Sequence, residues 1–189
     1  MASIDLDRML AKVKATQWSL ADIDWNAPGA ELVTGNPELY AKLKPFMADL
    51  MWIEHIGARA FSAMSKKAPT ETLKQIYSHF HAEEQRHANA EMALMQRWGM
   101  LPEDGSIPEP NKNLRLTIKW LDTYADKMPF YVLGAVIPML EVALDGALCT
   151  FLLETVEDPI CHRAFDLIND DESRHLGVGF SVMEAQGYN

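Results

Sequence analysis

Two short segments of the chain repeat one pattern, an acid followed by Glu, any residue, Arg and His, and this repeat restricts the fold more than any other feature. The segments span residues 83–87 and 171–175. In each, the glutamate and the histidine are three residues apart, and residues with this spacing share one face of an α-helix. One Glu-x-x-His on each of two helices, completed by one glutamate from each of two others, is the ligand set of a carboxylate-bridged di-metal site in a four-helix bundle. The repeat therefore predicts two metal-binding helices and requires two further glutamates.

Two glutamates stand at matching distances before the motifs. Glu54 precedes Glu84 by 30 residues, and Glu141 precedes Glu172 by 31. The midpoints of the two intervals fall near residues 69 and 157, where a proline beside a capping residue indicates a turn between helices. Residues equidistant from the turn of an antiparallel helix hairpin lie at the same level, so each glutamate is expected to face its own motif. The predicted metal ligands are Glu54, Glu84, His87, Glu141, Glu172 and His175.

The two added glutamates lie among apolar residues. Glu54 lies between Ile53 and Ile56, and Glu141 follows the apolar run at residues 132–140. A buried carboxylate costs several kcal/mol unless it is paired or bound to a metal ion. The alternative interpretation, in which the histidines are satisfied core residues and the glutamates are solvated, has to treat six matched positions as coincidence.

The helical spacing predicts a single all-α domain over residues 1–189, a four-helix bundle made of two antiparallel hairpins. Residues 1–35 are expected to form an N-terminal helix and a cover segment whose role is packing. Residues 37–98 form the first predicted hairpin, residues 99–129 a crossing connection, and residues 130–185 the second hairpin. Within the connection, a short helix near residues 112–127 is expected to cross the end of the bundle.

Composition excludes several classes of partner. The formal net charge is −10 and the isoelectric point is near 5.0, so nucleic acid and anionic membrane surfaces would be repelled. The sequence has no secretory signal pattern and no apolar run of membrane-spanning length, which predicts a cytoplasmic protein. Cys149 and Cys161 have no ligand spacing and are predicted to be buried, reduced thiols.

The predicted ligand set favours particular metals. Carboxylates and imidazoles without thiolates favour iron or manganese over structural zinc. Six ligands for two ions leave coordination positions open, and dioxygen can bind there. We therefore expect two iron ions as the cofactor, with manganese or a mixed manganese–iron pair as the alternatives.

With these motifs, the chain resembles the ferritin-like di-iron carboxylate superfamily over roughly residues 37–185. The two motifs look most like those of its oxygen-activating branch, which includes soluble acyl carrier protein desaturases, bacterial multicomponent monooxygenase hydroxylases and arylamine N-oxygenases. The resemblance implies a ferritin-like bundle and gives the six predicted ligands their metal-binding roles. It also implies a set of residues that orient the histidines and balance charge, namely Glu83, Arg86, Asp171 and Arg174.

Two positions depart from familiar relatives. Ribonucleotide reductase small subunits have a radical tyrosine one turn beyond the first motif, where this chain has Glu91, so a radical-storage role is disfavoured. Many monooxygenases have a proton-delivering threonine one turn after the third-helix glutamate, where this chain has Asp145. Glu91, as an extra ligand or acid, and Asp145, as a proton donor, are the candidate catalytic residues; an ordinary helix carboxylate and a partner of an arginine are the alternatives.

Small and aromatic residues near the ligands indicate a substrate pocket, with core packing as the alternative. Gly57 and Ala58 follow Glu54 by one turn. The side chains expected to line an apolar cavity are Phe61, Phe80, Leu144, Leu148 and Phe165.

The resemblance and the site together predict a di-iron oxidoreductase that uses dioxygen to hydroxylate, desaturate or N-oxygenate a small, mostly apolar organic substrate. The sequence has no flavin, nicotinamide or iron–sulfur motif, so an external reductase or ferredoxin is expected to supply electrons. Ferritin-like or rubrerythrin-like iron oxidation or peroxide reduction is the main alternative. A metal-stabilised scaffold without catalysis is a third. The apolar helices leave room for a homodimer.

Overall fold

The computed structural model describes residues 4–187, apart from the side chains of residues 143–147. This part of the chain contains helices and no β-strand, which confirms the predicted all-α class. The helices are α1 (Leu6–Ala15), the 3-10 helix η1 (Leu20–Asp22), α2 (Glu31–Thr34), α3 (Pro37–Lys67), α4 (Glu71–Arg97), α5 (Lys112–Tyr124), α6 (Phe130–Thr155) and α7 (Pro159–Ala185). Among the described residues, no helix combines the length and apolar character needed to span a membrane.

The long helices begin where the sequence provides capping side chains. Asn36, Thr70 and Asp158 cap α3, α4 and α7, and each accepts a hydrogen bond from a backbone N–H in the first turn. Such caps satisfy backbone donors that the helix itself leaves open. At the other end of α4, Gly99 takes a positive φ of 66° and ends the helix, as its position predicts.

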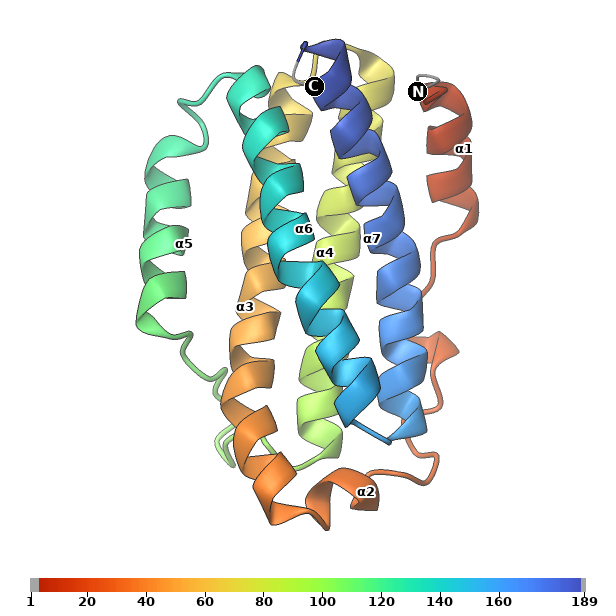
Figure 1. Cartoon of the computed structure of the whole chain (residues 1–189), viewed down its shortest axis with the longest axis vertical. Helices are drawn as coiled ribbons and strands as arrows, with labels where there is room; N and C mark the ends of the chain where they lie inside the picture. The colour runs from red at the N-terminus through yellow and green to blue at the C-terminus, as the bar shows by residue number, and fades with distance from the viewer. Residues whose placement is uncertain (1–3, 188–189) are drawn as a thin grey trace.

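The four long helices lie side by side as two hairpins, α3 with α4 and α6 with α7 (Figure 1). Between the hairpins, α3 contacts α6 and α4 contacts α7. Helix α1 lies outside this group against α4 and α7. Each helix of one hairpin therefore packs on one helix of the other hairpin.

The position of α5 differs from the prediction. Instead of crossing the end of the bundle, α5 runs along the outside of α3 and parallel to it (Figure 1). Asn111 at its start donates to Asp49, whereas Lys67 at the end of α3 donates to the backbone of Asp126 and Met128 beyond it. Because α6 begins at the opposite end of the bundle from the end of α4, the connection has to travel the length of α3.

A layer of buried polar residues divides the hydrophobic core. On α3 the first core cluster ends at Leu50 and the second begins at Ile56, with Glu54 between them. The other three long helices show the same interruption, and buried charged residues occupy it on each of them. The same level of the bundle therefore carries polar side chains from all four helices.

Away from this layer, one buried ion pair joins three segments. The Asp158 carboxylate is fully buried and accepts from Arg97 Nε at 2.8 Å and Trp98 Nε1 at 2.8 Å, and it also caps α7 through Ile160 N at 3.0 Å. Arg97 in turn donates to the backbone carbonyl of Trp25 at 2.7 Å. Asp158 thus ties the end of α4, the start of α7 and the N-terminal segment together.

We predict that Asp158→Ala lowers the free energy of unfolding by about 3 to 5 kcal/mol, because it leaves the nearly buried Arg97 guanidinium without its counter-charge. Urea denaturation followed by circular dichroism measures this change. The control is Glu38→Ala, which breaks an exposed pair with Lys42 and should leave the free energy of unfolding almost unchanged. Equal effects of the two substitutions would contradict the structural role of Asp158.

Candidate metal centre

Each long helix contributes to the buried polar layer. Glu54 comes from α3, Glu84 and His87 from α4, Glu141 from α6, and Glu172 and His175 from α7; all six side chains are buried. The predicted ligands are therefore brought to one level of the bundle.

The six residues form two groups that share members. One group is Glu54, Glu84, His87 and Glu172, and the other is Glu84, Glu141, Glu172 and His175. Within each group, one ligand atom per residue lies within 4.8 Å of the others. Glu84 and Glu172 belong to both groups, so these two carboxylates would be shared if each group held a metal ion, and the other four residues would each belong to one group.

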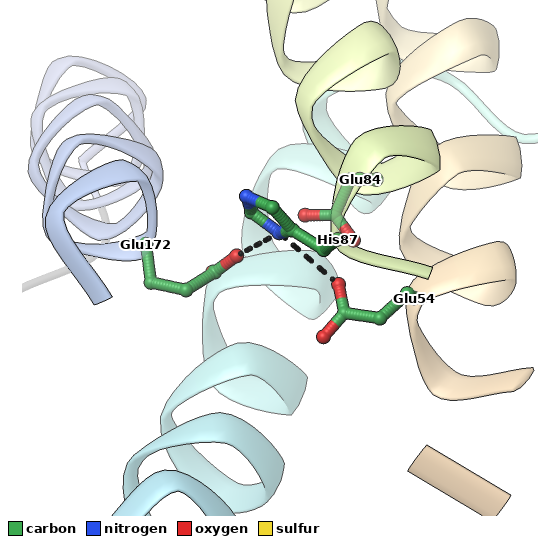
Figure 2. Close-up of side chains that lie close together, drawn as sticks. All are labelled: Glu54, Glu84, His87 and Glu172. Carbon is green, nitrogen blue, oxygen red and sulfur yellow. Dashed lines mark hydrogen bonds and ion pairs between the residues drawn. The ribbon is translucent and has the colours of Figure 1, made fainter. Parts of the chain in front are cut away.

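The histidines turn the same ring nitrogen toward the carboxylates. His87 Nδ1 lies 3.3 Å from Glu54 Oε2 and 3.1 Å from Glu172 Oε1 (Figure 2). His175 Nδ1 lies 3.1 Å from Glu84 Oε1 and 3.3 Å from Glu172 Oε2. Both Nδ1 atoms are thus placed as metal-binding atoms, and both Nε2 atoms are left for partners on the outer side.

The outer partners are the acids that begin the two motifs. The acid of each motif contacts the histidine of the other motif, on the other helix. Asp171 of α7 contacts His87 Nε2 of α4 at 3.0 Å, and Glu83 of α4 contacts His175 Nε2 of α7 at 2.9 Å. A carboxylate that accepts the second N–H of an imidazole fixes its tautomer and orientation for metal binding. Each motif therefore orients the histidine of the other.

The motif arginines lie between these outer acids. Arg86 Nη2 is 3.1 Å from Asp171 and 3.8 Å from Glu83, and Arg174 Nη2 is 3.3 Å from Glu83 and also bonded to Asp171. The two arginines balance the charges of the two outer acids, and two divalent ions would balance the four inner glutamates. These contacts bring Glu83, Arg86, Asp171 and Arg174 together beside the two histidines, and their role in orienting metal ligands stays a prediction.

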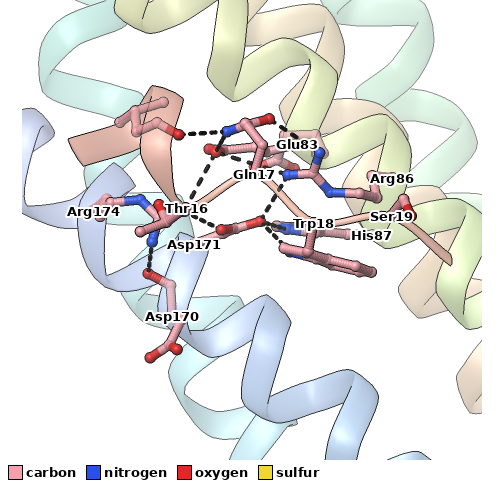
Figure 3. Close-up of polar contacts among 12 residues, drawn as sticks. Thr16, Gln17, Trp18, Ser19, Glu83, Arg86, His87, Asp170, Asp171 and Arg174 are labelled. Carbon is pink, nitrogen blue, oxygen red and sulfur yellow. Dashed lines mark hydrogen bonds and ion pairs between the residues drawn. The ribbon is translucent and has the colours of Figure 1, made fainter. Parts of the chain in front are cut away.

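Sequence reasoning missed two residues of the N-terminal cover segment. Gln17 donates to Glu83 at 2.5 Å, and the indole N–H of Trp18 donates to Asp171 at 2.9 Å (Figure 3). Neither residue has a spacing that relates it to the motifs, so no signal in the sequence identified them. The cover segment, expected only to pack, is bonded to both outer acids.

Burial and the charges of neighbouring groups shift the pKa values of the residues in this layer. Burial raises the pKa of Glu84 well above its usual range, and burial raises the pKa of Glu141 to about 8. Burial alone would lower the pKa of His87 and of His175, but the carboxylates around each ring raise it well above the usual value. Burial likewise opposes ionisation of Glu172, but the charge on His175 lowers the pKa of that carboxyl below its ordinary value.

Glu141 gives the most direct test of whether the site fits a metal ion. Both of its carboxylate oxygens are buried, and neither has a hydrogen-bond partner in the described part of the protein. An isolated buried carboxylate is costly, and a metal ion shared with Glu84, Glu172 and His175 would remove that cost. The donor set and this carboxylate together fit a divalent cation bound by nitrogen and oxygen.

Two glycines leave room for the layer, though not for a substrate. A methyl group on Gly57 would overlap the carboxylate of Glu84, which occupies the space that the sequence had indicated as part of a pocket. A methyl group on Gly179 would overlap Pro138, the proline one turn before Glu141. Close packing of α3 on α4 and of α6 on α7 at this level therefore depends on glycine.

Aromatic side chains enclose the His175 side of the layer. The Phe80 ring centroid lies 4.1 Å from that of His175, and the Phe61 centroid lies 5.0 Å away. Both phenylalanines are buried, and Phe165 belongs to the core cluster below the layer. These three side chains pack in the core in place of lining a cavity, and Leu144 lies outside the described side chains.

The two candidate catalytic residues have different outcomes. Glu91 is fully buried on α4, neither ligand group among the described residues includes it, and its role as an added ligand stays a prediction. Its proposed role as an acid stays a prediction. Asp145 lies outside the described side chains. Cys149 and Cys161 are buried thiols, and burial raises the pKa of Cys161.

Comparisons of the chain with protein-family models, with curated proteins and with solved structures found no match. The assignment of this site therefore depends on its own residues and geometry.

We predict that Gly57→Ala weakens metal binding at least about ten-fold, because the methyl group meets the flexible end of Glu84, and the bridging carboxylate has to move. Alanine is the better helix former by about 1 kcal/mol, so the fold should be retained. The matched control is Gly177→Ala on α7, where a methyl group makes only an ordinary contact. Titration calorimetry with Mn(II) measures both, and equal affinities would contradict the packing of Glu84 on Gly57.

We also predict that metal binding releases protons and strengthens as pH rises from about 6 to about 8. The pKa values of His87, His175 and Glu84 are raised above their ordinary range and that of Glu141 is raised to about 8, so protons compete with a metal ion for these groups, and each has to lose its proton to bind metal. Calorimetry of Mn(II) binding in buffers with different ionisation enthalpies counts the protons. An affinity independent of pH across this interval would contradict the prediction.

Proposed function

We propose that this protein is a ferritin-like di-iron oxidoreductase that activates dioxygen to oxidise a mostly apolar organic substrate. The observation that carries the proposal is the pair of buried four-residue groups that share Glu84 and Glu172. Two shared carboxylates would suit a pair of neighbouring ions, whereas a mononuclear or structural site has no need of a shared pair. A bundle core that supplies one glutamate from each of two helices and Glu-x-x-His from two others is the ferritin-like arrangement.

Two bound ferrous ions would supply the electrons that dioxygen accepts, a reaction that protein side chains do not perform. In a hydroxylation, one oxygen atom enters a C–H bond of the substrate. The other leaves as water after two electrons and two protons are added. The two electrons for each turnover would come from an external reductase or ferredoxin.

The residues of the chain would hold and tune this centre. Asp171 and Glu83 fix the ring orientations of His87 and His175, and they increase the electron donation of the two imidazoles to the metal. Around His175, the buried aromatic side chains would exclude water from the centre.

The test is anaerobic titration with Fe(II), followed by exposure to dioxygen and measurement of the iron oxidised per chain by absorbance. We expect saturation at about two irons per chain. Glu172→Gln should impair binding of both ions because Glu172 belongs to both groups, whereas Glu141→Gln should impair mainly one. Glu154→Gln, an exposed glutamate on the same helix as Glu141, is the matched control and should bind iron normally.

The outcomes separate the alternatives. Oxygen consumption that depends on an added reductant and an apolar substrate supports the oxygenase. Oxidation of many irons per chain would favour ferritin-like iron oxidation, and rapid consumption of hydrogen peroxide would favour a rubrerythrin-like reaction. A chain that binds no iron contradicts all of these functions.

A further inference from the structure

The N-terminal cover segment places consecutive side chains on the two outer acids of the candidate centre. Gln17 Nε2 lies 2.5 Å from Glu83 Oε1, and Trp18 Nε1 lies 2.9 Å from Asp171 Oδ2 (Figure 3). Glu83 is the partner of His175, and Asp171 is the partner of His87. One short stretch of chain is therefore connected to both histidines, each through a different carboxylate.

Further contacts fix these two side chains. The Gln17 amide also donates to the backbone carbonyl of Val13 at 2.8 Å and accepts from Arg86 Nη1 at 3.1 Å, which determines the orientation of the amide. The Arg86 guanidinium lies over the Trp18 ring at 4.8 Å, and that ring is nearly parallel to the His87 ring. Arg86 thus bonds Gln17, stacks on Trp18 and reaches Asp171, so the contacts form one connected network.

The segment also limits access of water to this network. A surface cavity of about 150 Å³ is lined by Trp18, Asp171 and Arg174 together with residues of α1 and α7. Asp171 is nevertheless only 1% exposed. If the Trp18 ring moved away, water could compete for the carboxylate that orients His87.

We propose that Gln17 and Trp18 are positioning residues of the metal centre, Gln17 for the His175 side and Trp18 for the His87 side. They act by holding Glu83 and Asp171 in the orientation that directs each imidazole Nδ1 at its ion. This inference depends on the proposed function for the presence of two metal ions. It extends the ligand-orienting network by one layer and assigns the cover segment a role in metal affinity.

The test uses Co(II) as the probe, with the full-length chain. Trp18→Phe keeps the ring and removes the N–H, and Gln17→Met keeps the approximate size of the side chain and removes the amide. Each is expected to weaken Co(II) binding about ten-fold in calorimetric titrations, the lower end of the range for residues that support metal ligands.

Trp25→Phe is the matched control, because Trp25 lies in the same segment and its indole N–H bonds the backbone of Leu20, outside the network. Gln75→Met is the control for Gln17, because the Gln75 amide bonds Lys14 on the surface.

A second measurement separates positioning from a general loss of stability. In the Co(II)-loaded protein, each metal-bound histidine should give one strongly shifted imidazole Nε2–H signal in the proton NMR spectrum. Trp18→Phe should shift one of the two signals, and Gln17→Met should shift the other. A merely structural role would change both signals together or neither.

The outcomes distinguish this inference from the proposed function. If the unmodified protein binds no Co(II), both are overturned. If it binds two ions and the variants match their controls in affinity and in both N–H signals, the positioning role is overturned while the proposed function stands. Should Trp18→Phe fail to fold, Gln17→Met alone decides, since the Gln17 side chain is exposed and can be replaced without opening the core.

Discussion

Four glutamates and two histidines face one another in the middle of the bundle, and the rest of the structure is arranged around their charge. Four carboxylates in an apolar interior repel one another and lose hydration, so the layer is stable only with protons or cations bound to it. The two hydrophobic core clusters lie above and below this layer and hold the four helices in register. Packing of the two hydrophobic clusters therefore offsets the free-energy cost of keeping the charged groups together.

From the centre of the bundle outward, each set of charged side chains is balanced by the groups that surround it. The inner glutamates need bound protons or cations, the outer acids Glu83 and Asp171 are balanced by Arg86 and Arg174, and side chains of the cover segment bond the outer acids. Because each outer acid belongs to the opposite motif from the histidine that it contacts, α4 and α7 cannot shift along each other without losing both contacts. The same hydrogen bonds thus fix the helix register and the orientation of the histidines.

Much of the candidate site could be predicted from local spacing. The i,i+3 motifs, the caps at Asn36, Thr70 and Asp158, and the nearly equal distances of Glu54 and Glu141 from their turns indicated the long helices and the six buried residues that meet between them. The position of α5 was predicted incorrectly, since periodicity gives the length of a helix and not the side of the bundle on which the chain returns. Gly57 was read as an opening because its small size is visible in the sequence, but the Glu84 carboxylate that covers it is not.

The sequence by itself determined the class of fold and which carboxylates and imidazoles meet. Helical periodicity places the residues of each motif on one face of a helix, and residues equidistant from the turn of a helix hairpin lie at the same height in the bundle. Only the tertiary structure decided that Glu84 and Glu172 are shared by both ligand groups, that the outer acids exchange partners, and that Gln17 and Trp18 join them. These contacts link residues up to 153 positions apart. No local preference records such contacts, because they arise when the cover segment and helices from both hairpins pack against one another.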